Sequence, residues 1–285
     1  MSVWCLQLPS YPQYFSSLSF RKFIKRLVTT PSSSSCLPRK STLVGASLQR
    51  PQLEYLTTRQ QEQISVYVDA LLQWNQRMNL TAVKETTDVM KRHVEDSLAI
   101  IPPIQNSYLS HCGSSCEGLK LVDVGSGPGL PGLIFAIACP SWQVTLLESM
   151  QKRCLFLEHA VAVTRLSNVQ ILRVRAEDAG QDQNFRETFD VSVARAVAEM
   201  RILAEYCLPM VRVGGLFVAA KGYDPQEEIK KAEKAIHVMG ASILQLCSVE
   251  SHGPHGQRSA VVCIKNHPTP RKYPRPPGQP AKDPL

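Results

Sequence analysis

The chain has 285 residues, 44% of them hydrophobic, with 32 Lys and Arg against 24 Asp and Glu, a net charge of +8. No run approaches the roughly 18 apolar residues that a membrane-spanning helix needs, and the composition excludes a collagen-like fibre or a fully disordered chain. A positive net charge suggests a nucleic-acid-binding protein. How this charge is interpreted depends on where it lies along the chain.

Most of the positive charge lies in the first fifty residues. They contain seven basic residues, eleven serines and no acid, and so account for +7 of the +8. Apolar and basic residues interleave between residues 18 and 28 with helical spacing, as in a basic amphipathic segment. This composition is typical of an organellar transit peptide, and a solvated tail is the alternative. We therefore expect residues 1–50 to be a disordered transit peptide for the chloroplast stroma or, alternatively, the mitochondrion.

Helical patterns follow this leader. Thr58 and Gln61 have the spacing of a capping box before an apolar stripe that continues to Met78. A second helix is expected over 86–100, so that residues 51–105 form a helical N-terminal extension. Residues 106–118 are small and polar and predict a linker or insertion.

Nine cysteines are scattered along the chain without the spacing of a disulfide framework or a Cys-x-x-Cys pair. His111, Cys112 and Cys116 form the one cluster, and further ligands at zinc-binding spacing are missing from the sequence around it. We therefore expect a reducing compartment and no metal site.

Strands and helices alternate from residue 119. The strands are expected at 119–124, 144–147, 169–174, 189–193, 216–220, 242–249 and 259–264. Repeated β-α alternation predicts an α/β domain over 119–265 with a doubly wound, mostly parallel, seven-stranded sheet, whose ligands bind at the carboxyl ends of the strands. Residues 266–285 are a basic, proline-rich tail that should be extended, either packed on the surface or free.

A glycine-rich turn follows the first of these strands, in the sequence Asp123-Val124-Gly125-Ser126-Gly127-Pro128-Gly129-Leu130-Pro131-Gly132. Glycines let the main chain take positive φ and approach a ligand closely. The spacing also matches the dinucleotide fingerprint, so an NAD enzyme is an alternative. The two prolines remove N–H donors, which suits a ligand without a pyrophosphate and favours S-adenosylmethionine.

Three further acidic residues, at the ends of two strands, belong to the same expected site. Glu148 ends the second strand, where a carboxylate can accept hydrogen bonds from both ribose hydroxyls. Glu177 and Asp178 follow the third strand, in a loop that commonly faces the adenine ring. An ordinary helix cap is the alternative for this loop.

Several blocks carry a resemblance to a known family. They are Trp74-Asn75-x-x-Met78-Asn79-Leu80-Thr81, Arg92-His93-x-x-Asp96-Ser97, the glycine-rich turn, Lys152-Arg153-x-x-Phe156-Leu157, Arg175-Ala176-Glu177, Ala194-Arg195-Ala196, Lys221-Gly222 and Lys272-Tyr273-Pro274-Arg275. Together they resemble the bacterial ribosomal RNA small subunit methyltransferase G family, also called glucose-inhibited division protein B, over about residues 57–280.

The resemblance implies a class I, Rossmann-like methyltransferase fold that uses S-adenosylmethionine to methylate guanine N7 in small-subunit rRNA. By motif position, the cofactor contacts would be Gly125, Leu130, Ala176, Glu177 and Arg195. The turn adds Gly127 and Gly129, and Glu148 is added from its strand position. The extra leader points to an organellar homologue that acts on the organelle's own rRNA.

Guanine N7 has a free lone pair, so its methylation requires alignment and no general base. His93 and Asp96, three residues apart, either position the base or its phosphate or form an internal hydrogen bond. Phosphate contacts are expected from exposed basic residues, namely Arg92, Lys152, Arg153, Lys221, Arg271, Lys272 and Arg275.

The expected partner is small-subunit rRNA or a small-subunit ribosomal particle, bound by a monomer without membrane contact. Two other functions remain open from the sequence. One is a methyltransferase of a small molecule or a protein, and the other is a ribosome-associated RNA-binding protein with a vestigial cofactor site.

Overall fold

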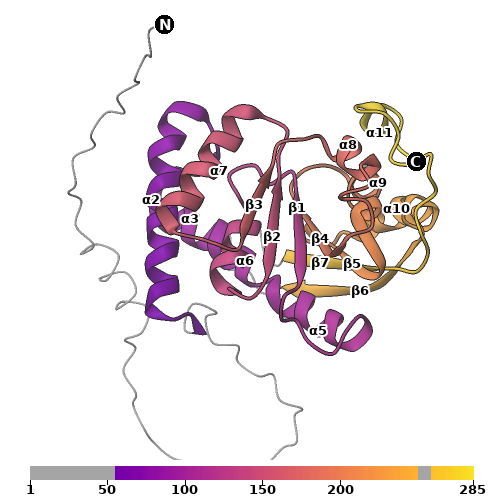
Figure 1. Cartoon of the computed structure of the whole chain (residues 1–285), viewed down its shortest axis with the longest axis horizontal. Helices are drawn as coiled ribbons and strands as arrows, with labels where there is room; N and C mark the ends of the chain where they lie inside the picture. Colours follow the sequence, from indigo (N-terminus) through magenta and orange to yellow (C-terminus); the bar gives the residue numbers. More distant parts are fainter. Residues whose placement is uncertain (1–54, 250–257) are drawn as a thin grey trace, which may run out of the picture. The chain divides into compact units, whose positions relative to one another are not determined.

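The computed structural model describes residues 55–249 and 258–285 and shows an α/β domain (Figure 1). The expected transit peptide lies outside the described residues. Seven strands form one sheet in the order β3-β2-β1-β4-β5-β7-β6. The strands are β1 Lys120–Val124, β2 Gln143–Leu147, β3 Val169–Leu172, β4 Phe189–Arg195, β5 Val211–Lys221, β6 Ala241–Val249 and β7 Arg258–Lys265. The doubly wound fold expected from the sequence is confirmed.

The direction of the strands determines where a ligand can bind. Strands β1 to β5 are parallel, whereas β7 runs antiparallel to both β5 and β6. Strand order reverses at β1, which lies between β2 and β4. At such a switch point the loops after neighbouring strands turn to opposite faces of the sheet and leave a crevice at their carboxyl ends.

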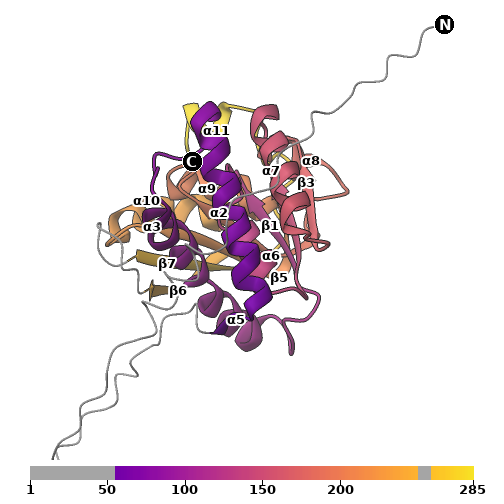
Figure 2. The same ribbon diagram turned by 90° about the vertical axis from the view of Figure 1, so that its left-hand side faces the viewer.

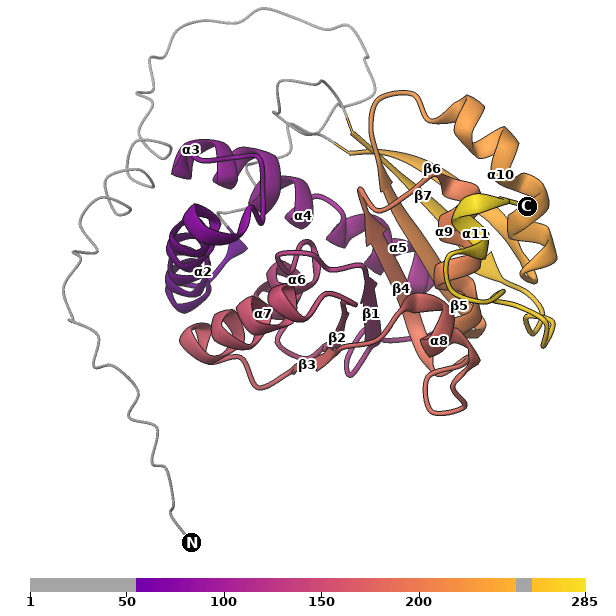
Figure 3. The same ribbon diagram turned by 90° about the horizontal axis from the view of Figure 1, so that it is seen from above.

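Helices cover both faces of the sheet (Figures 1 and 3). One face carries α8, α9 and α10, whose apolar side chains share a core with β1, β4 and β5. The helices α6 and α7 cover the opposite face at β1 to β3, and α5 covers it at β5 and β7. The bounds are α5 Ile101–His111, α6 Gly132–Ala138, α7 Gln151–Thr164, α8 Ala176–Gln181, α9 Met200–Cys207 and α10 Gln226–Val238, with the short helices η3 Leu208–Met210 and α11 Gln279–Lys282.

The N-terminal extension packs on helices α6 and α7, which cover one face of the sheet. Helix α2, Thr58–Met78, lies along α6 and α7 (Figure 2). The capping box is formed by Thr57 and Gln60, one residue earlier than the sequence pattern suggested. The Gln60 amide also donates to the Ile137 carbonyl at 2.8 Å, and Gln63 donates to the Thr164 carbonyl at 2.8 Å. Both acceptors lie at the ends of helices, where carbonyls lack intrahelical partners.

The second expected helix is longer and less regular than the sequence indicated. The chain forms α3 Thr86–Val89, a π-helical segment η2 Met90–Glu95, α4 Asp96–Leu98 and then α5. The predicted linker 106–118 is therefore wrong in its first half, because residues 106–111 are the end of α5. Tyr108 in α5 is buried and donates to Asp190 at 3.0 Å, so this segment is anchored to β4.

Within the part of the chain that the structure describes, no helix is both long and apolar enough to cross a membrane. Likewise, no group of three or more His, Cys, Asp or Glu side chains among these residues could hold a metal ion.

Candidate active site

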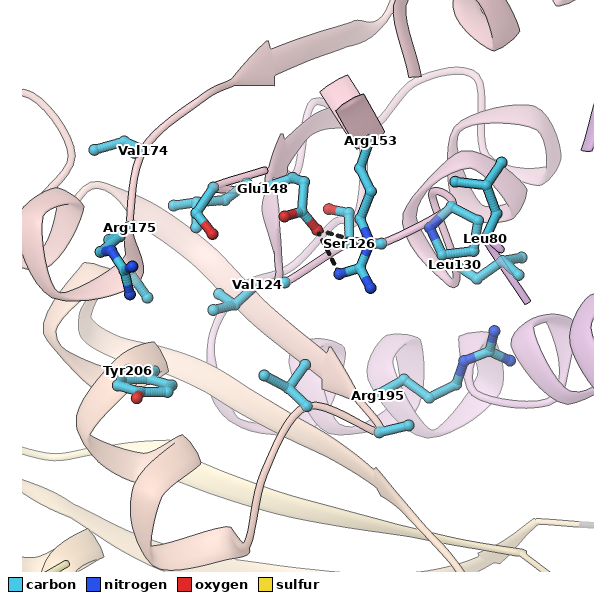
Figure 4. Close-up of a pocket in the computed structure, with 18 of the residues that line it drawn as sticks. Leu80, Val124, Ser126, Leu130, Glu148, Arg153, Val174, Arg175, Arg195 and Tyr206 are labelled. Atoms are coloured by element: carbon cyan, nitrogen blue, oxygen red, sulfur yellow. Dashed lines mark hydrogen bonds and ion pairs between the residues drawn. The ribbon is translucent and has the colours of Figure 1, made fainter. Parts of the chain in front are cut away.

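A cavity of about 530 Å³ opens at the carboxyl ends of β1, β2 and β4, at the point where the strand order reverses (Figure 4). Its volume lies in the usual range for small-molecule sites. Its walls come from the glycine-rich turn after β1, the loops after β2, β3 and β4, the loop after α2, His93 of η2, the start of α8 and helix α9. The lining residues include Thr81, His93, Gly125, Gly127, Glu148, Arg153, Glu177, Arg195 and Tyr206.

The glycine-rich turn brings bare main chain to the cavity. Gly125 has φ +72° and Gly127 has φ +58°, conformations that L side chains rarely adopt. A Cβ atom on Gly125 would approach Cγ2 of Val197, in the loop after β4, to 2.9 Å. The turn and the β4 loop therefore meet closely enough that a side chain at Gly125 would fill the cradle between them.

Glu148 fixes the opposite wall at the end of β2. Its carboxylate is 3% exposed and accepts main-chain hydrogen bonds from Gly127 at 3.0 Å and Met150 at 2.8 Å. Arg153 on α7 reaches back to the same carboxylate at 3.4 Å, as Figure 4 shows. A carboxylate offers about four acceptor positions, so one remains for a ligand hydroxyl. Glu148 therefore both shapes the turn and faces the site.

A second carboxylate, Asp123, lies beneath the turn. It is fully buried and accepts a hydrogen bond from the Gly132 amide at 2.9 Å. Burial raises its pKa to about 7, while the Gly132 amide and nearby Arg195 act in the opposite direction. Burial lowers the pKa of Arg195 in turn, against the attraction of Asp123 and Asp96. Arg195, which lines the cavity, is therefore electrostatically coupled to two buried carboxylates that lie behind the cavity wall.

His93 lies in η2 and lines the cavity. The Thr81 hydroxyl accepts from the Val83 amide at 3.1 Å and so can donate to Nε2 of His93 at 2.8 Å. Nδ1 of His93 then donates to the Arg92 carbonyl at 3.0 Å, which assigns the neutral Nδ1–H tautomer. Burial and Arg195 lower the pKa of His93 to about 4. With both nitrogens engaged, His93 is not a general base in this arrangement.

Asp96 does not join His93 at the cavity. Its carboxylate, 1% exposed, forms an ion pair with Arg258 at the start of β7. The paired role considered for these two residues therefore separates: His93 faces the site, and Asp96 ties α4 to the sheet. Arg258 gave no sequence signal, because it lies far from Asp96 along the chain.

The wall formed by α8 and α9 contains Glu177 and Tyr206, both of which line the cavity. The Glu177 carboxylate is 5% exposed and accepts a hydrogen bond from the main-chain amide of Gly278 at 2.9 Å. Burial raises the pKa of Tyr206, and the nearby Glu177 carboxylate acts in the same direction. Sequence reasoning placed Glu177 here but missed Tyr206 and the C-terminal tail.

The structure changes the interpretation of three of the basic residues that were expected to bind phosphate. Lys221 is paired with Glu228 at 2.6 Å, and Arg275 with the buried Glu205 at 2.7 Å. Arg153 belongs to the cofactor-side wall beside Glu148. The other four, Arg92, Lys152, Arg271 and Lys272, are at least partly exposed and remain predictions as RNA contacts.

The residues present fit a nucleoside-bearing cofactor. The cavity of about 530 Å³ has room for a ligand beside the bare main chain of Gly125 and Gly127, and two carboxylates, Glu148 and Glu177, lie on its walls. A seven-stranded sheet of this order with a ligand crevice at β1 defines a class I methyltransferase fold, whose cofactor is S-adenosylmethionine.

The family can be named more narrowly. Residues 60–259 match the model of the rRNA small subunit methyltransferase G family, GidB, and the chain belongs to this family. A ribosomal RNA small subunit methyltransferase G from Alkaliphilus oremlandii is 44% identical over 230 residues, which cover 81% of this chain and 92% of that protein. One from Desulfitobacterium hafniense is 38% identical over 252 residues, 87% of this chain and 99% of that protein.

Among solved structures, the Aeropyrum pernix fibrillarin with natively bound S-adenosyl-L-methionine has a TM-score of 0.41 and 17% identity. The similarity covers 52% of this chain and 67% of that one.

Proposed function

We propose that this protein transfers the methyl group of S-adenosylmethionine to N7 of a guanine in 16S-type small-subunit rRNA. The observation that carries the proposal is the family match over residues 60–259, which spans the turn Gly125–Gly132, Glu148, Glu177 and Arg195. The cavity at the carboxyl ends of β1, β2 and β4 supports it, because it brings all four elements together.

The chemistry suits a site without a general base. Guanine N7 attacks with its own lone pair, so catalysis depends on alignment and on exclusion of water. When bound, S-adenosylmethionine supplies an activated methyl group on a sulfonium. The protein's own residues have two tasks. The glycine-rich turn and Glu148 would hold the cofactor, and His93 and the loop after β4 line the side from which the guanine would enter. The neutral, fully hydrogen-bonded His93 is consistent with this role.

The direct test is methyl transfer by protein lacking residues 1–50. Label from S-adenosylmethionine should enter unmodified small-subunit rRNA or a small-subunit particle, and 7-methylguanosine should be found by mass spectrometry. Label that resists ribonuclease would indicate a small-molecule or protein substrate instead. No binding of S-adenosylmethionine by calorimetry would indicate an RNA-binding protein with a vestigial site.

We further propose that the protein acts in the chloroplast stroma, on the organelle's own rRNA. The support is the composition of residues 1–50, which are serine-rich and free of acid and precede the part that matches the family. A fluorescent protein fused to residues 1–50 should enter plastids. A fusion that stays in the cytosol would refute the targeting, and one that enters mitochondria would favour the alternative organelle.

A further inference from the structure

The C-terminal tail, residues 266–285, is bound along helices α8 and α9 (yellow in Figure 1). Arg186, in the loop after α8, joins helix α8 to the tail. Its guanidinium donates to the Gly180 carbonyl at 2.7 Å, to the Tyr273 carbonyl at 2.8 Å and to the Thr269 carbonyl at 2.7 Å. One side chain thus ties the end of α8 to two turns of the tail.

A second anchor joins the tail to α9. Arg275 makes a bidentate pair with Glu205, with Nε to Oε1 at 2.9 Å and Nη2 to Oε2 at 2.7 Å. Its main-chain amide also donates to Oε1 of Glu205 at 2.8 Å. Glu205 is 1% exposed, so this is a buried, geometrically matched pair of the stronger kind.

The tail also packs closely on α8. A Cβ atom on Gly180 would lie 2.8 Å from Cγ of Pro274, and Gln181 donates to the Pro274 carbonyl at 2.8 Å. Helix α8 is only six residues long, too short to be stable by itself. Its position is therefore determined by what packs against it, and the tail is one such support.

These anchors lead to a contact at the cavity itself. Beyond Arg275, the main-chain amide of Gly278 donates to Oε1 of Glu177 at 2.9 Å. Gly278 has φ +83°, a conformation that favours glycine at this position. Glu177 lines the cavity together with Tyr206. The tail therefore binds the Glu177 carboxylate of the cavity wall, although Gly278 and Glu177 are 101 positions apart in the chain.

We infer that the tail, through the amide of Gly278, is a positioning element of the cofactor site: it fixes the Glu177 side chain and the first turn of α8 against the adenosyl part of S-adenosylmethionine. The inference rests on the proposed use of this cofactor. It assigns the tail to cofactor affinity, whereas the chemistry takes place at the other side of the cavity, near His93 and Arg195.

The test uses two substitutions at Gly278 in the chain lacking residues 1–50. Gly278→Val disfavours the positive φ, because a β-branched residue rarely adopts it, and so displaces the amide. Gly278→Asn is the matched control, since asparagine tolerates this conformation. A Cβ atom at position 278 meets nothing within 4 Å, so neither substitution introduces a clash at Cβ, and the two differ mainly in how well they tolerate the positive φ.

For Gly278→Val we expect about tenfold weaker binding of S-adenosylhomocysteine by calorimetry and a similar rise in KM for S-adenosylmethionine. The kcat at saturating cofactor should change less than twofold, and Gly278→Asn should stay within threefold of the parent in all three. A loss of kcat with unchanged KM, or equal effects of Val and Asn, would overturn the inference.

A pair of truncations gives an independent check. Chains ending at residue 277 and at residue 282 both lack Asp283 and Leu285, but only the shorter lacks Gly278. The shorter should bind S-adenosylhomocysteine at least tenfold more weakly than the longer. Equal binding by the two would overturn the inference. If the parent chain itself failed to bind, the proposed function would fail rather than the role of the tail.

Discussion

At the scale of single residues, the cavity depends on side chains that do two things at once. Glu148 accepts two main-chain amides and retains acceptor capacity toward the cavity. The sequence indicated its position after β2 but not its contacts, since Gly127 and Arg153 reach it only in the folded chain. Its first task is therefore to shape the turn that surrounds the ligand.

Glu148→Ala should weaken binding of S-adenosylhomocysteine by at least tenfold. The substitution leaves the buried Gly127 amide without its acceptor, which costs about 1–3 kcal/mol. Glu148→Gln keeps one acceptor oxygen and should lose less. Calorimetry measures both, and Glu158→Gln, an exposed position on α7, is the control. Equal binding by Glu148→Ala and the parent chain would contradict this role.

His93 predicts a specific pH dependence. Its pKa is about 4 in the folded chain, below the ordinary value of 6.5, because burial and Arg195 disfavour the charged ring. A lowered pKa means that the unfolded state binds more protons between these values. The stability from neutral His93 is therefore present above pH 6.5 and is lost as the pH falls toward 4.

Denaturant unfolding of the parent chain and of His93→Gln at pH 7 and pH 5 tests this prediction. The free energy of unfolding should fall more for the parent than for the variant. A fall of equal size in both chains would mean that His93 is not responsible.

At the scale of elements, the N-terminal extension is part of the methyltransferase core. Gln60 closes the capping box of α2 and also donates to the carbonyls of Ile137 and Ala138, at the end of α6. An isolated helix would not show this, because the acceptors lie 77 and 78 positions away. Sequence reasoning found the helix but placed its first turn one residue late.

Gln60→Ala should lower the free energy of unfolding by about 1–3 kcal/mol, the combined effect of a lost cap and of part-buried carbonyls left without a donor. Denaturant unfolding measures it. The exposed Glu62→Ala on the same helix should change stability by less than about 0.5 kcal/mol. Similar losses in the two variants would show that Gln60 acts only through helix propensity.

At the scale of the whole molecule, a buried lysine joins the last strand to the centre of the domain. Lys265 at the end of β7 is fully buried and donates to the carbonyls of Leu208 at 2.7 Å and Val211 at 3.2 Å, and to Glu187 at 3.2 Å. Burial lowers its pKa to about 8, with Glu187 acting in the opposite direction. Its charge links β7, β5 and the loop before β4.

The unfolded state binds more protons at this lysine between pH 8 and 10.5, so its contribution to stability becomes more favourable as the pH rises through that range. The unfolding free energy of the parent should therefore rise relative to that of Lys265→Met when the pH is raised from 7.5 to 9.5. Thermal and denaturant unfolding at both pH values measures it. If the unfolding free energy of the parent minus that of the variant were the same at both pH values, the lowered pKa of Lys265 would be contradicted.

The fold and the core of the site could be predicted because their signals are local. Strand β1, Lys120–Val124, and the glycines after it can be recognised from a few residues each. Strand burial and positive φ are properties of short segments. Glu148, one strand further on, follows from the same regular β-α order. The linker over 106–118 was misjudged because helix α5 is stabilised by contacts such as Tyr108 with Asp190, which composition does not show.

The α/β class, the position of the glycine-rich turn and the family to which the chain belongs all follow from the amino-acid sequence, because their signals lie in short segments. Three contacts appear only in the folded chain: Arg258 pairs with Asp96, both ring nitrogens of His93 form hydrogen bonds, and the Gly278 amide donates to Glu177. The contacts of Asp96 with Arg258 and of Glu177 with Gly278 join residues that are distant in the chain, and those of His93 depend on the irregular path of η2 beside the loop after α2. Such contacts depend on packing that no local pattern encodes. The basic tail, which suggested RNA binding in the sequence, is in the folded chain a support of the cavity wall.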